Sequence, residues 1–331
     1  MSKKTISSKK PLISVLVCNY NYANYIEETL KSAILQDYAN IEIVIVDDGS
    51  TDNSKEVIKN FIKNHPDSNI NLISRGNKGV AFSRNEAIKK SNGEYFIFLD
   101  SDDLLPESYI SKMFEVMQKT GAGVVYGGMK HFGDENFIVE QPDFEMSKFL
   151  LGNFVNITSL VKKEVVKGVR FDRAFDNQQL EDYDFWLGLA LRGVRFEKAK
   201  DVFLNYRVHY KSRHLSKDRR KSIEKNIESW IEIIQKYQKQ FPEQTKNAVE
   251  NKLKYHFIEV DELRQEVSKL NDEIQNNLFI EIQKRNKHIQ YLEDKIKDLE
   301  KWQEEIKQSR WYKIQNEFSK KLKTIKRRKN A

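Results

Sequence analysis

Residues 93–103 read GEYFIFLDSDD, an apolar and aromatic run that ends in three carboxylates. The run 95–99 is typical of a buried strand, and Asp100, Asp102 and Asp103 follow it directly. Like charges a few ångströms apart raise each other's pKa, so such a cluster is costly unless a cation accompanies it. A divalent metal removes this cost, and a metal held by few protein carboxylates also binds phosphates. The segment therefore predicts metal-assisted chemistry on a phosphorylated ligand.

The sequence around this run alternates between short apolar runs and amphipathic stretches. Strands are predicted at 12–18, 41–46, 70–74, 95–99 and 123–131, with helices between them. The first, second and fourth runs are almost continuously apolar, as expected where helices cover both faces of a sheet. This order predicts an α/β fold with a mainly parallel, Rossmann-like sheet and right-handed crossovers. Asp52 is expected to cap the second helix.

The rest of the chain is first irregular and then helical. Residues 132–215 predict a strand at 154–161, a helix at 183–191 and a strand at 202–209. From residue 216 the pattern is strongly helical, and Pro242 interrupts it once. We therefore expect a catalytic domain at 11–215, a helical connector at 216–256 and nearly continuous helix over 243–331.

An apolar stripe runs along residues 257–308. Its first members, spaced 4-3-4, are Leu263, Val267, Leu270 and Ile274. A 3-4 pattern resumes over 282–299, after a stutter at Leu278 that would locally unwind a coiled coil. The stripe fits either packing on the chain's own catalytic domain or a coiled coil between chains. Its narrow width and charged flanks favour a homo-oligomer, whose number of chains the pattern does not specify.

The net charge of +8 lies at the two ends of the 331-residue chain. Residues 310–331 carry nine Lys and Arg against one acid, and the tail 1–10 carries four Lys and no acid. Subtracting +8 and +4 leaves residues 11–309 with a charge of −4. A nucleic-acid-binding protein needs a basic stripe on a folded surface, so no nucleic-acid partner is expected.

The C-terminal residues 309–331 combine this charge with an apolar face. One helical face would present Trp311, Ile314, Phe318, Leu322 and Ile325, with lysines and arginines around it. This pattern is typical of a helix lying in a membrane interface, and it predicts an anionic membrane surface as partner. The alternative is a solvated helix end or a disordered tail.

Other features indicate the compartment. The chain has one cysteine, Cys18, which excludes an intramolecular disulfide and fits a reducing compartment. No apolar run reaches the length of a membrane-spanning helix, and the lysine-rich N-terminus lacks the apolar region of a secretory signal. We expect a cytoplasmic protein, peripheral at the inner face of the cell membrane.

Polar side chains follow three of the predicted strands. Cys18 and Tyr20 end the first strand, Asp47 and Asp48 the second, and Asp100 the fourth. In open α/β sheets ligands bind beyond the carboxyl ends of the strands. Tyr20 can stack on a base, and Asp48 can accept a hydrogen bond from a base or ribose. The alternative for Asp47 and Asp48 is the turn chemistry common in Asp-Gly-Ser.

These residues resemble the family 2 glycosyltransferases, which are inverting, sugar-nucleotide-dependent enzymes of GT-A fold. The resemblance covers roughly residues 11–215. It depends on SVLVCNYN at 14–21, VDDGSTD at 46–52, NKGVAFSRNEAI at 77–88, GEYFIFLDSDD at 93–103 and LEDYDFW at 180–186. The chain departs from the polytopic synthases of that family, whose Gln-x-x-Arg-Trp motif and membrane helices it lacks.

The resemblance implies how the donor is bound. Cys18 and Tyr20 lie where the family contacts the nucleoside, and Asp48 lies where it recognises the base, supported by Asp47. Arg84 lies near the ribose and sugar of the donor.

The resemblance also implies a metal, Mg²⁺ or Mn²⁺. Asp102 would bind it, while Asp100 would touch ribose or a metal-bound water. Asp103 either supports this site or caps the helix that follows. His209 lies where the family often places a His near metal and diphosphate, before a loop at 211–220 that closes over the donor. A solvent-facing strand histidine is the alternative for His209.

Asp182 and Glu181 resemble the Glu-Asp motif that supplies the family's base. We assign Asp182 as the base that deprotonates the acceptor hydroxyl, and Glu181 as a residue that binds the acceptor or supports the site. The alternative is that two acids merely favour the N-terminus of a helix.

The resemblance thus implies a hexosyltransferase-class enzyme. It would move a sugar from a nucleotide sugar, with a UDP-sugar favoured, to a hydroxyl of a growing surface glycan or lipid-linked saccharide. Donor and acceptor specificity is expected in residues 132–180, with Asn156, Thr158, Gln178 and Gln179 as candidates.

Two other functions fit parts of the sequence. A phosphohydrolase of the haloacid-dehalogenase type also begins with a strand-ending Asp-x-Asp, as at Asp100 and Asp102. It would need a Thr where this chain has Leu104, and it would not need the VDDGS strand. The second alternative is a coiled-coil membrane tether with a degenerate catalytic domain, which would bind no nucleotide sugar.

Overall fold

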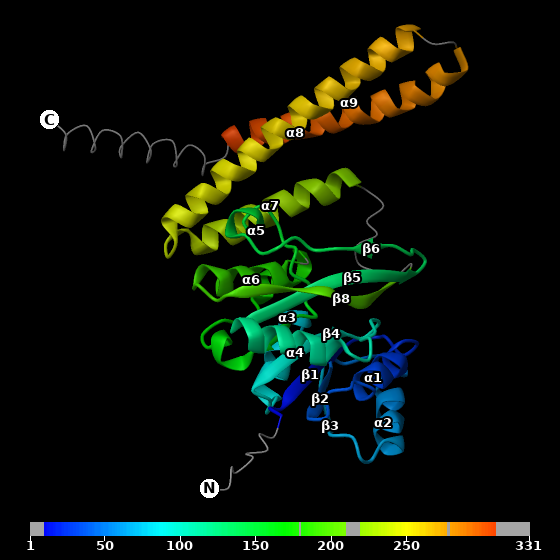
Figure 1. Ribbon diagram of the computed structural model, residues 1–331, viewed down its shortest axis with the longest axis vertical. Coiled ribbons are helices and arrows are strands. Elements are labelled where there is room, and N and C mark those ends of the chain that lie inside the picture. Colours follow the sequence, from blue (N-terminus) through cyan, green and yellow to red (C-terminus); the bar gives the residue numbers. More distant parts are fainter. Residues whose placement is uncertain (1–9, 179, 210–218, 277–278, 309–331) are drawn as a thin grey trace, which may run out of the picture. The chain divides into compact units, whose positions relative to one another are not determined.

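The computed structural model describes residues 10–178, 180–209, 219–276 and 279–308 (Figure 1). The basic tail with its apolar face, the loop after His209, Leu278 and Gln179 lie outside the described residues. The chain divides into two compact units, residues 1–217 and 218–331. No helix in the described part of the chain is long and apolar enough to cross a membrane.

The first unit is an α/β domain. Its strands are β1 (Ile13–Asn19), β2 (Ile41–Asp47), β3 (Ile70–Ser74), β4 (Tyr95–Asp100), β5 (Val124–Gly133), β6 (Ile138–Val139), β7 (Leu160–Lys162) and β8 (Phe196–Val208). Its α-helices are α1 (Ile26–Ile34), α2 (Ser54–Asn64), α3 (Val80–Lys90), α4 (Tyr109–Thr120), α5 (Met146–Phe149) and α6 (Glu181–Leu191). Short 3₁₀ helices span Lys163–Val166 and Arg173–Gln178.

The strands form one mixed sheet in which most pairings are parallel. Their order is β3-β2-β1-β4-β7-β5-β6, with β8 paired to β5. Among the strands that the structure describes, β7 and β6 run antiparallel to the strands with which they pair. The predicted α/β architecture with a mainly parallel sheet is therefore confirmed.

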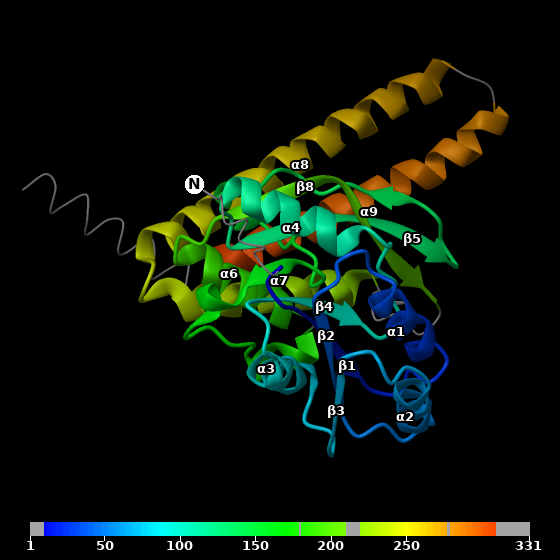
Figure 2. The ribbon, with the colours of Figure 1, turned by 60° about the horizontal axis from the view of Figure 1, so that its bottom comes forward.

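Helices cover both faces of the sheet (Figure 2). On one face the alternate residues Ile13, Val15 and Val17 of β1 pack with buried residues of α1, α2 and α4. On the other face α3 packs along β1 and β2. Coverage of both faces explains why these strands are apolar at almost every position.

The register brings three strand ends together. Asn19 of β1 lies beside Asp47 of β2, and Cys18 lies beside Asp100 of β4. Because all three strands are parallel, the polar residues that follow them meet at one edge of the sheet.

At the opposite, amino-terminal edge one buried carboxylate is fully surrounded by donors. Glu42 accepts hydrogen bonds from Ser14 Oγ at 2.6 Å, from Asn92 Nδ2 at 2.9 Å and from the Gly93 N–H at 3.1 Å. Burial by itself raises the pKa of Glu42, but these hydrogen bonds outweigh burial, and the pKa lies below its usual value.

Two predicted strands differ from the observed strands by several residues. The strand expected at 154–161 is wrong except for its last two residues, which begin β7. Residues before it bond through side chains instead: Asn156 Nδ2 donates to the Gly127 carbonyl at 2.8 Å, and Ser159 Oγ donates to the Asn156 carbonyl at 2.7 Å. The strand expected at 202–209 begins earlier, at Phe196.

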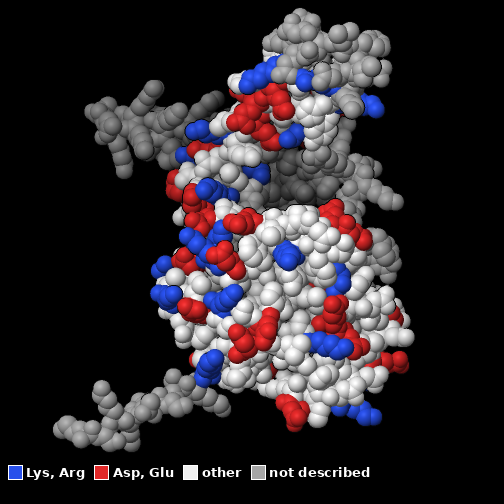
Figure 3. Space-filling view, turned by 45° about the vertical axis from the view of Figure 1, so that its right-hand side comes forward, with Lys and Arg blue, Asp and Glu red and all other residues white. Residues whose placement is uncertain are grey.

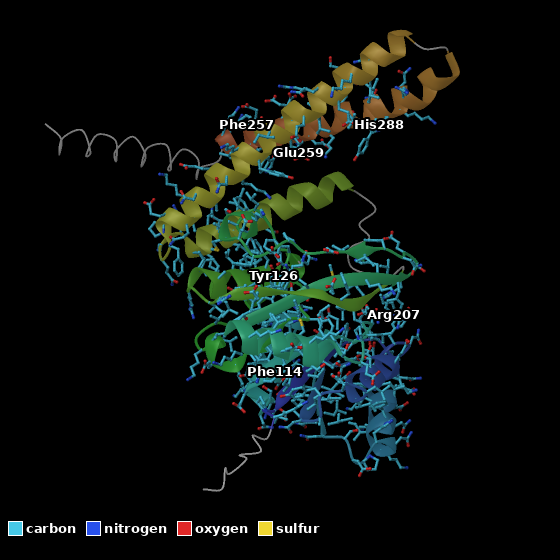
Figure 4. All side chains as sticks on the ribbon, viewed as in Figure 1. Phe114, Tyr126, Arg207, Phe257, Glu259 and His288 are labelled. Atoms are coloured by element: carbon cyan, nitrogen blue, oxygen red, sulfur yellow. The ribbon has the colours of Figure 1, made fainter. Side chains whose placement is uncertain are left out.

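The second unit consists of α7 (Arg219–Gln238), α8 (Pro242–Asn276) and α9 (Phe279–Gln308). Pro242 is the first residue of α8, a position where its missing N–H costs nothing. The stretch expected to be nearly continuous helix is instead two helices that pack against each other. Two contacts between them, Glu259 with Lys295 at 2.9 Å and Glu266 with His288 at 3.4 Å, show that they run antiparallel (Figure 4).

The apolar stripe of this unit packs within the chain, between α8 and α9. Val260 and Leu263 of α8 pack with Leu292 and Leu299 of α9, and Lys and Arg mix with Asp and Glu on the outer surface (Figure 3). A hairpin explains the same heptad-like spacing without a second chain. Self-association through a coiled coil stays a prediction.

Candidate active site

A pocket of about 700 Å³ opens at the carboxyl edge of the sheet. This volume is within the usual range for small-molecule sites. Eight of the predicted site residues line it: Cys18, Tyr20, Asp48, Arg84, Asp100, Asp102, Glu181 and Asp182. Asp47 and His209 do not line the pocket, whereas the candidates Asn156 and Thr158 do.

The turn after β4 crowds three carboxylates. The Asp103 N–H donates to the Asp100 carbonyl at 3.1 Å, which folds the chain back on itself. The Asp100 side chain is 40% exposed, whereas Asp103 is buried. Burial raises the pKa of Asp102, and the nearby Asp100 raises it further, while His209 lowers it.

The end of β8 holds this turn from behind. Arg207 Nε donates to the Asp102 carbonyl at 2.8 Å, and the Arg207 N–H donates to Asp103 Oδ1 at 2.8 Å (Figure 4). The predicted helix cap at Asp103 is wrong, because the next helix begins only at Tyr109. Asp103 instead joins the Asp-x-Asp turn to β8, although burial and its acidic neighbours raise its pKa well above the usual value.

His209 contacts the turn as well. Its Nε2 lies 3.0 Å from Asp102 Oδ2, and its ring stacks on Tyr25 at 4.9 Å between centroids. The histidine is buried, so it is not the solvent-facing strand residue considered as the alternative.

These side chains fit a divalent cation. Burial and the repulsion from Asp100 both oppose the charge of Asp102, and a cation would relieve the repulsion. Carboxylate oxygen is the ligand that Mg²⁺ and Mn²⁺ prefer. Among the described residues no three His, Cys, Asp or Glu side chains are arranged to hold a metal alone. A cation here would take its remaining ligands from water or substrate.

Arg84 connects the two acidic motifs. Its Nη1 donates to Glu181 Oε1 at 2.9 Å, and its Nη2 lies 3.5 Å from Asp100 Oδ1. The guanidinium is 6% exposed and lies against the rings of Phe98 and Phe171, at 5.8 and 5.4 Å. It therefore stays fixed and charged between them.

Asp182 is half-buried in the first turn of α6. Burial raises its pKa to about 7, Glu181 adds to this rise, and Arg84 opposes it. A carboxyl group with a pKa near the working pH suits a general base. Glu181 is buried, and its Oε2 has no hydrogen-bond partner among the described residues.

The residues after β2 make an ordered turn. Asp47 Oδ1 accepts hydrogen bonds from Asn19 Nδ2 at 3.0 Å and Ser50 Oγ at 2.6 Å, so its role here is structural. Asp48 pairs with Arg75 and accepts hydrogen bonds from the backbone N–H groups of Lys78 and Gly79, at 2.8 and 2.9 Å. Recognition of a base by Asp48 stays a prediction.

Cys18 and Tyr20 end β1 inside the pocket. Tyr20 is 42% exposed, which leaves its ring accessible for stacking. Burial raises the pKa of Cys18 to about 12, so the thiol stays protonated.

Asp52 holds the next loop as well as the helix start. Its Oδ1 accepts from the N–H of Ser54, the first residue of α2, at 2.9 Å, and its Oδ2 accepts from the Ala23 N–H at 3.0 Å. The N-cap position belongs to Asn53, so the predicted cap at Asp52 is one residue early, although its carboxylate still binds the first N–H of α2.

Several residues of the site were not predicted, and three of them are Arg75, Asp176 and Asn153. Arg75 follows β3 at the same sheet edge, a position that the strand-end argument could have indicated. Asp176 Oδ1 accepts from the Ala81 N–H at 3.0 Å in the first turn of α3, and a Cβ at Gly79 would collide with its carboxylate. Asn153 contacts Asp182 from a loop, and no sequence pattern marks either of these two.

The chain resembles known proteins in sequence. The family model described as Glycosyl transferase family 2 matches residues 14–176. Glycosyltransferase GlyG of Streptococcus pneumoniae is 33% identical over 194 residues, which cover 50% of this chain and 62% of GlyG, less than two thirds of its length. The Escherichia coli enzyme UDP-Glc:alpha-D-GlcNAc-diphosphoundecaprenol beta-1,3-glucosyltransferase WfaP is 32% identical over 207 residues, covering 60% of this chain and 78% of WfaP.

The fold is shared with solved structures. TarS 1-349 of S. aureus has a TM-score of 0.60 at 21% identity, covering 89% of this chain and 91% of that chain. Its complex with UDP-GlcNAc has a TM-score of 0.55 at 22% identity. The fold, the family model and the two relatives agree, and the chain belongs to glycosyltransferase family 2.

Proposed function

We propose that this glycosyltransferase is an inverting, metal-dependent enzyme that transfers a sugar from a nucleotide sugar to an acceptor hydroxyl. One observation carries the proposal: Asp182, with a pKa near 7, shares a pocket with the crowded acids Asp100 and Asp102. The first group suits proton removal, and the second suits a cation and phosphate.

The reaction follows from these positions. The Asp182 carboxylate accepts the proton of the acceptor hydroxyl, whose oxygen forms a bond to the anomeric carbon. The bond from that carbon to the diphosphate breaks on the opposite face, so the configuration inverts. Arg84 fixes Glu181 beside the base, which keeps a second carboxylate available to orient the acceptor.

The leaving diphosphate needs positive charge. Asp102, Asp100 and His209 would hold Mg²⁺ or Mn²⁺, which supplies Lewis-acid stabilisation of the diphosphate when bound. Cys18, Tyr20 and Asp48 lie at the strand ends where the nucleoside would be bound, and Arg207 keeps the Asp-x-Asp turn in shape.

The donor and acceptor classes are inferred from relatives. WfaP is named as a UDP-Glc-dependent enzyme that acts on a diphosphoundecaprenol-linked sugar, and TarS has been solved with UDP-GlcNAc. We infer a UDP-sugar donor and a glycan or lipid-linked acceptor at the cytoplasmic face of the membrane. The basic tail would bind that anionic surface, and the helical unit would associate with a second copy.

The test is sugar transfer from a panel of UDP-, GDP- and dTDP-sugars, with Mn²⁺ or with EDTA. We expect transfer or slow donor hydrolysis with a UDP-sugar that EDTA abolishes and that Asp182→Asn lowers by about a hundredfold or more. Full activity in EDTA or in Asp182→Asn would remove the mechanism. Release of inorganic phosphate from a simple phosphate ester would favour a phosphohydrolase instead.

A further inference from the structure

One asparagine touches the proposed base from outside its helix. Asn153 Nδ2 donates a hydrogen bond to Asp182 Oδ2 at 3.1 Å, and the Tyr183 N–H donates to Asp182 Oδ1 at 2.7 Å. Each carboxylate oxygen therefore has its own neutral donor. Asn153 lines the pocket beside Asp182, in the segment between α5 and β7.

The orientation of the Asn153 amide is fixed by its other end. Asn153 Oδ1 accepts a hydrogen bond from the Val155 N–H at 3.0 Å. Because an amide has one oxygen and one NH₂ group, this bond leaves only the NH₂ group to face Asp182. A flipped amide would lose both bonds and place two acceptors together.

The segment that carries Asn153 is tied to α6 at a second point. Tyr183 Oη donates to the Phe149 carbonyl at 2.9 Å, in a buried contact. Consecutive residues of α6, Asp182 and Tyr183, therefore hold the two ends of the segment 149–153. The backbone before Asn153 is placed by a bond that does not involve its amide.

We propose that Asn153 is a positioning residue for the base: its amide holds the Asp182 carboxylate in place and favours its charged form. The inference depends on the proposed role of Asp182 as the base. Asn153 itself moves no proton.

The other groups around Asp182 show why a neutral donor matters here. Glu181 on α6 and Asp100 on β4 oppose the charge of Asp182, as burial does, and Arg84 on α3 favours it. A hydrogen bond to the charged form of a carboxyl group lowers its pKa. If Asn153 were removed, Arg84 and the Tyr183 N–H would remain to stabilise the carboxylate against Glu181 and Asp100.

The experiment compares three variants by the pH dependence of kcat and of the donor KM, with Mn²⁺ present. Asn153→Asp keeps the oxygen that accepts from Val155 but replaces the donor by a negative charge. Asn153→Ala removes both bonds. The matched control, Tyr183→Phe, removes the other tie of the same segment and leaves the hydrogen bond from Asn153 in place.

For Asn153→Asp we expect the acidic limb of kcat to move up by about one pH unit or more. The rate would fall about tenfold near pH 6 and recover in alkaline buffer. The donor KM would stay unchanged, since Asn153 has no bond to Arg84, Asp100 or Asp102. Asn153→Ala would move the limb by about half a unit, because water can replace the donor, and Tyr183→Phe would lower kcat without moving it.

An acidic limb at the wild-type position in both Asn153 variants would overturn the inference, as would an equal shift in Tyr183→Phe. If Asn153→Asp does not fold, the shift expected for Asn153→Ala decides. The inference and the proposed function fail separately. An active Asp182→Asn enzyme would contradict the role of Asp182 as the base. If Asp182→Asn is inactive but the acidic limb does not move in the Asn153 variants, only the role of Asn153 is contradicted.

Discussion

At the amino end of the sheet Glu42 accepts hydrogen bonds from Ser14, Asn92 and Gly93, whereas at the carboxyl end Asp102 and Asp182 face other acids. Both edges bury carboxylates, yet the pKa is lowered at one edge and raised at the other. Protein donors fully compensate the burial of Glu42. For Asp102 and Asp182 the favourable contacts do not outweigh burial and the neighbouring acids, and a cation and a substrate can supply the missing stabilisation. Glu42 therefore stabilises the fold, whereas the acids of the pocket are those that we propose for the reaction.

The largest effect is expected on enzyme activity, from a substitution at the carboxyl edge, and its absence would contradict this comparison. Asp102→Asn keeps the shape of the side chain but removes one charge of the proposed metal pair. We expect transfer to fall about a thousandfold, because the cation loses a ligand. The free energy of unfolding, measured by urea denaturation without added metal, should not decrease, since repulsion from Asp100 is removed. Near wild-type transfer with Mn²⁺ would show that this acid is not needed.

The opposite pattern is expected at the amino edge. Glu42→Gln places an NH₂ group among donors, which leaves buried groups unpaired and should lower the free energy of unfolding by about 2–4 kcal/mol. The kcat of the folded protein should stay within about twofold, because Glu42 is remote from the pocket edge. The control is Glu56→Gln on α2, an exposed acid whose replacement should change stability by less than about 0.5 kcal/mol. A stable but inactive Glu42→Gln would reverse the comparison.

The pH dependence of stability sharpens the comparison further. The pKa of Asp182 rises from an ordinary 3.8 to about 7, so the folded protein keeps a proton that the unfolded chain releases. The contribution of Asp182 to the free energy of unfolding is therefore complete below pH 3.8 and is lost as the pH rises toward 7. Asp182→Asn avoids the loss, and we expect it to gain about 2 kcal/mol over wild type across that window, less than full linkage because Asp182 is half-buried. Urea denaturation at a series of pH values measures the difference, and a constant difference would contradict the assignment.

The smallest expected effect concerns Asp176, an acid of the pocket outside the proposed base and metal groups. Asp176 accepts from the Ala81 N–H in the first turn of α3, like a cap supplied from a distant segment. Asp176→Ala should lower the free energy of unfolding by about 1 kcal/mol. Asp176→Asn keeps an acceptor oxygen and should recover most of the loss in the same denaturation assay. Equal losses in the two variants would mean that the charge, and not the hydrogen bond, matters.

Much of the sheet could be predicted because strands that are buried on both faces are apolar at almost every position of the sequence. β1, β2 and β4 are almost continuously apolar, and their ends were predicted within one residue. The strand expected at 154–161 failed because side chains such as Asn156 replace the ladder hydrogen bonds there, and a residue pattern does not reveal such contacts. The antiparallel hairpin was missed because a stripe at heptad spacing fits a partner in the same chain or in another.

Residues that follow β1, β2 and β4 were predicted to meet, whereas Asn153 and Asp176, which come from the segment between β6 and α6, were missed. Parallel pairing puts Cys18, Asp48 and Asp100 at one edge, so their convergence follows from topology. Asn153 reaches Asp182 across 29 positions, and Asp176 reaches Ala81 across 95. Contacts of this kind depend on the folded path of irregular segments, which neither spacing nor composition encodes.

The state of Cys18 has a practical consequence for labelling. It is the single cysteine of the chain, and burial raises the pKa of its thiol to about 12, so it should react only slowly with maleimides and iodoacetamide. A cysteine introduced at an exposed position would then be modified selectively without first replacing the native one. With one introduced cysteine in each unit, the two sites together would carry a pair of spin labels or fluorophores. Their separation could be followed as donor and metal are added to an enzyme whose pocket remains native.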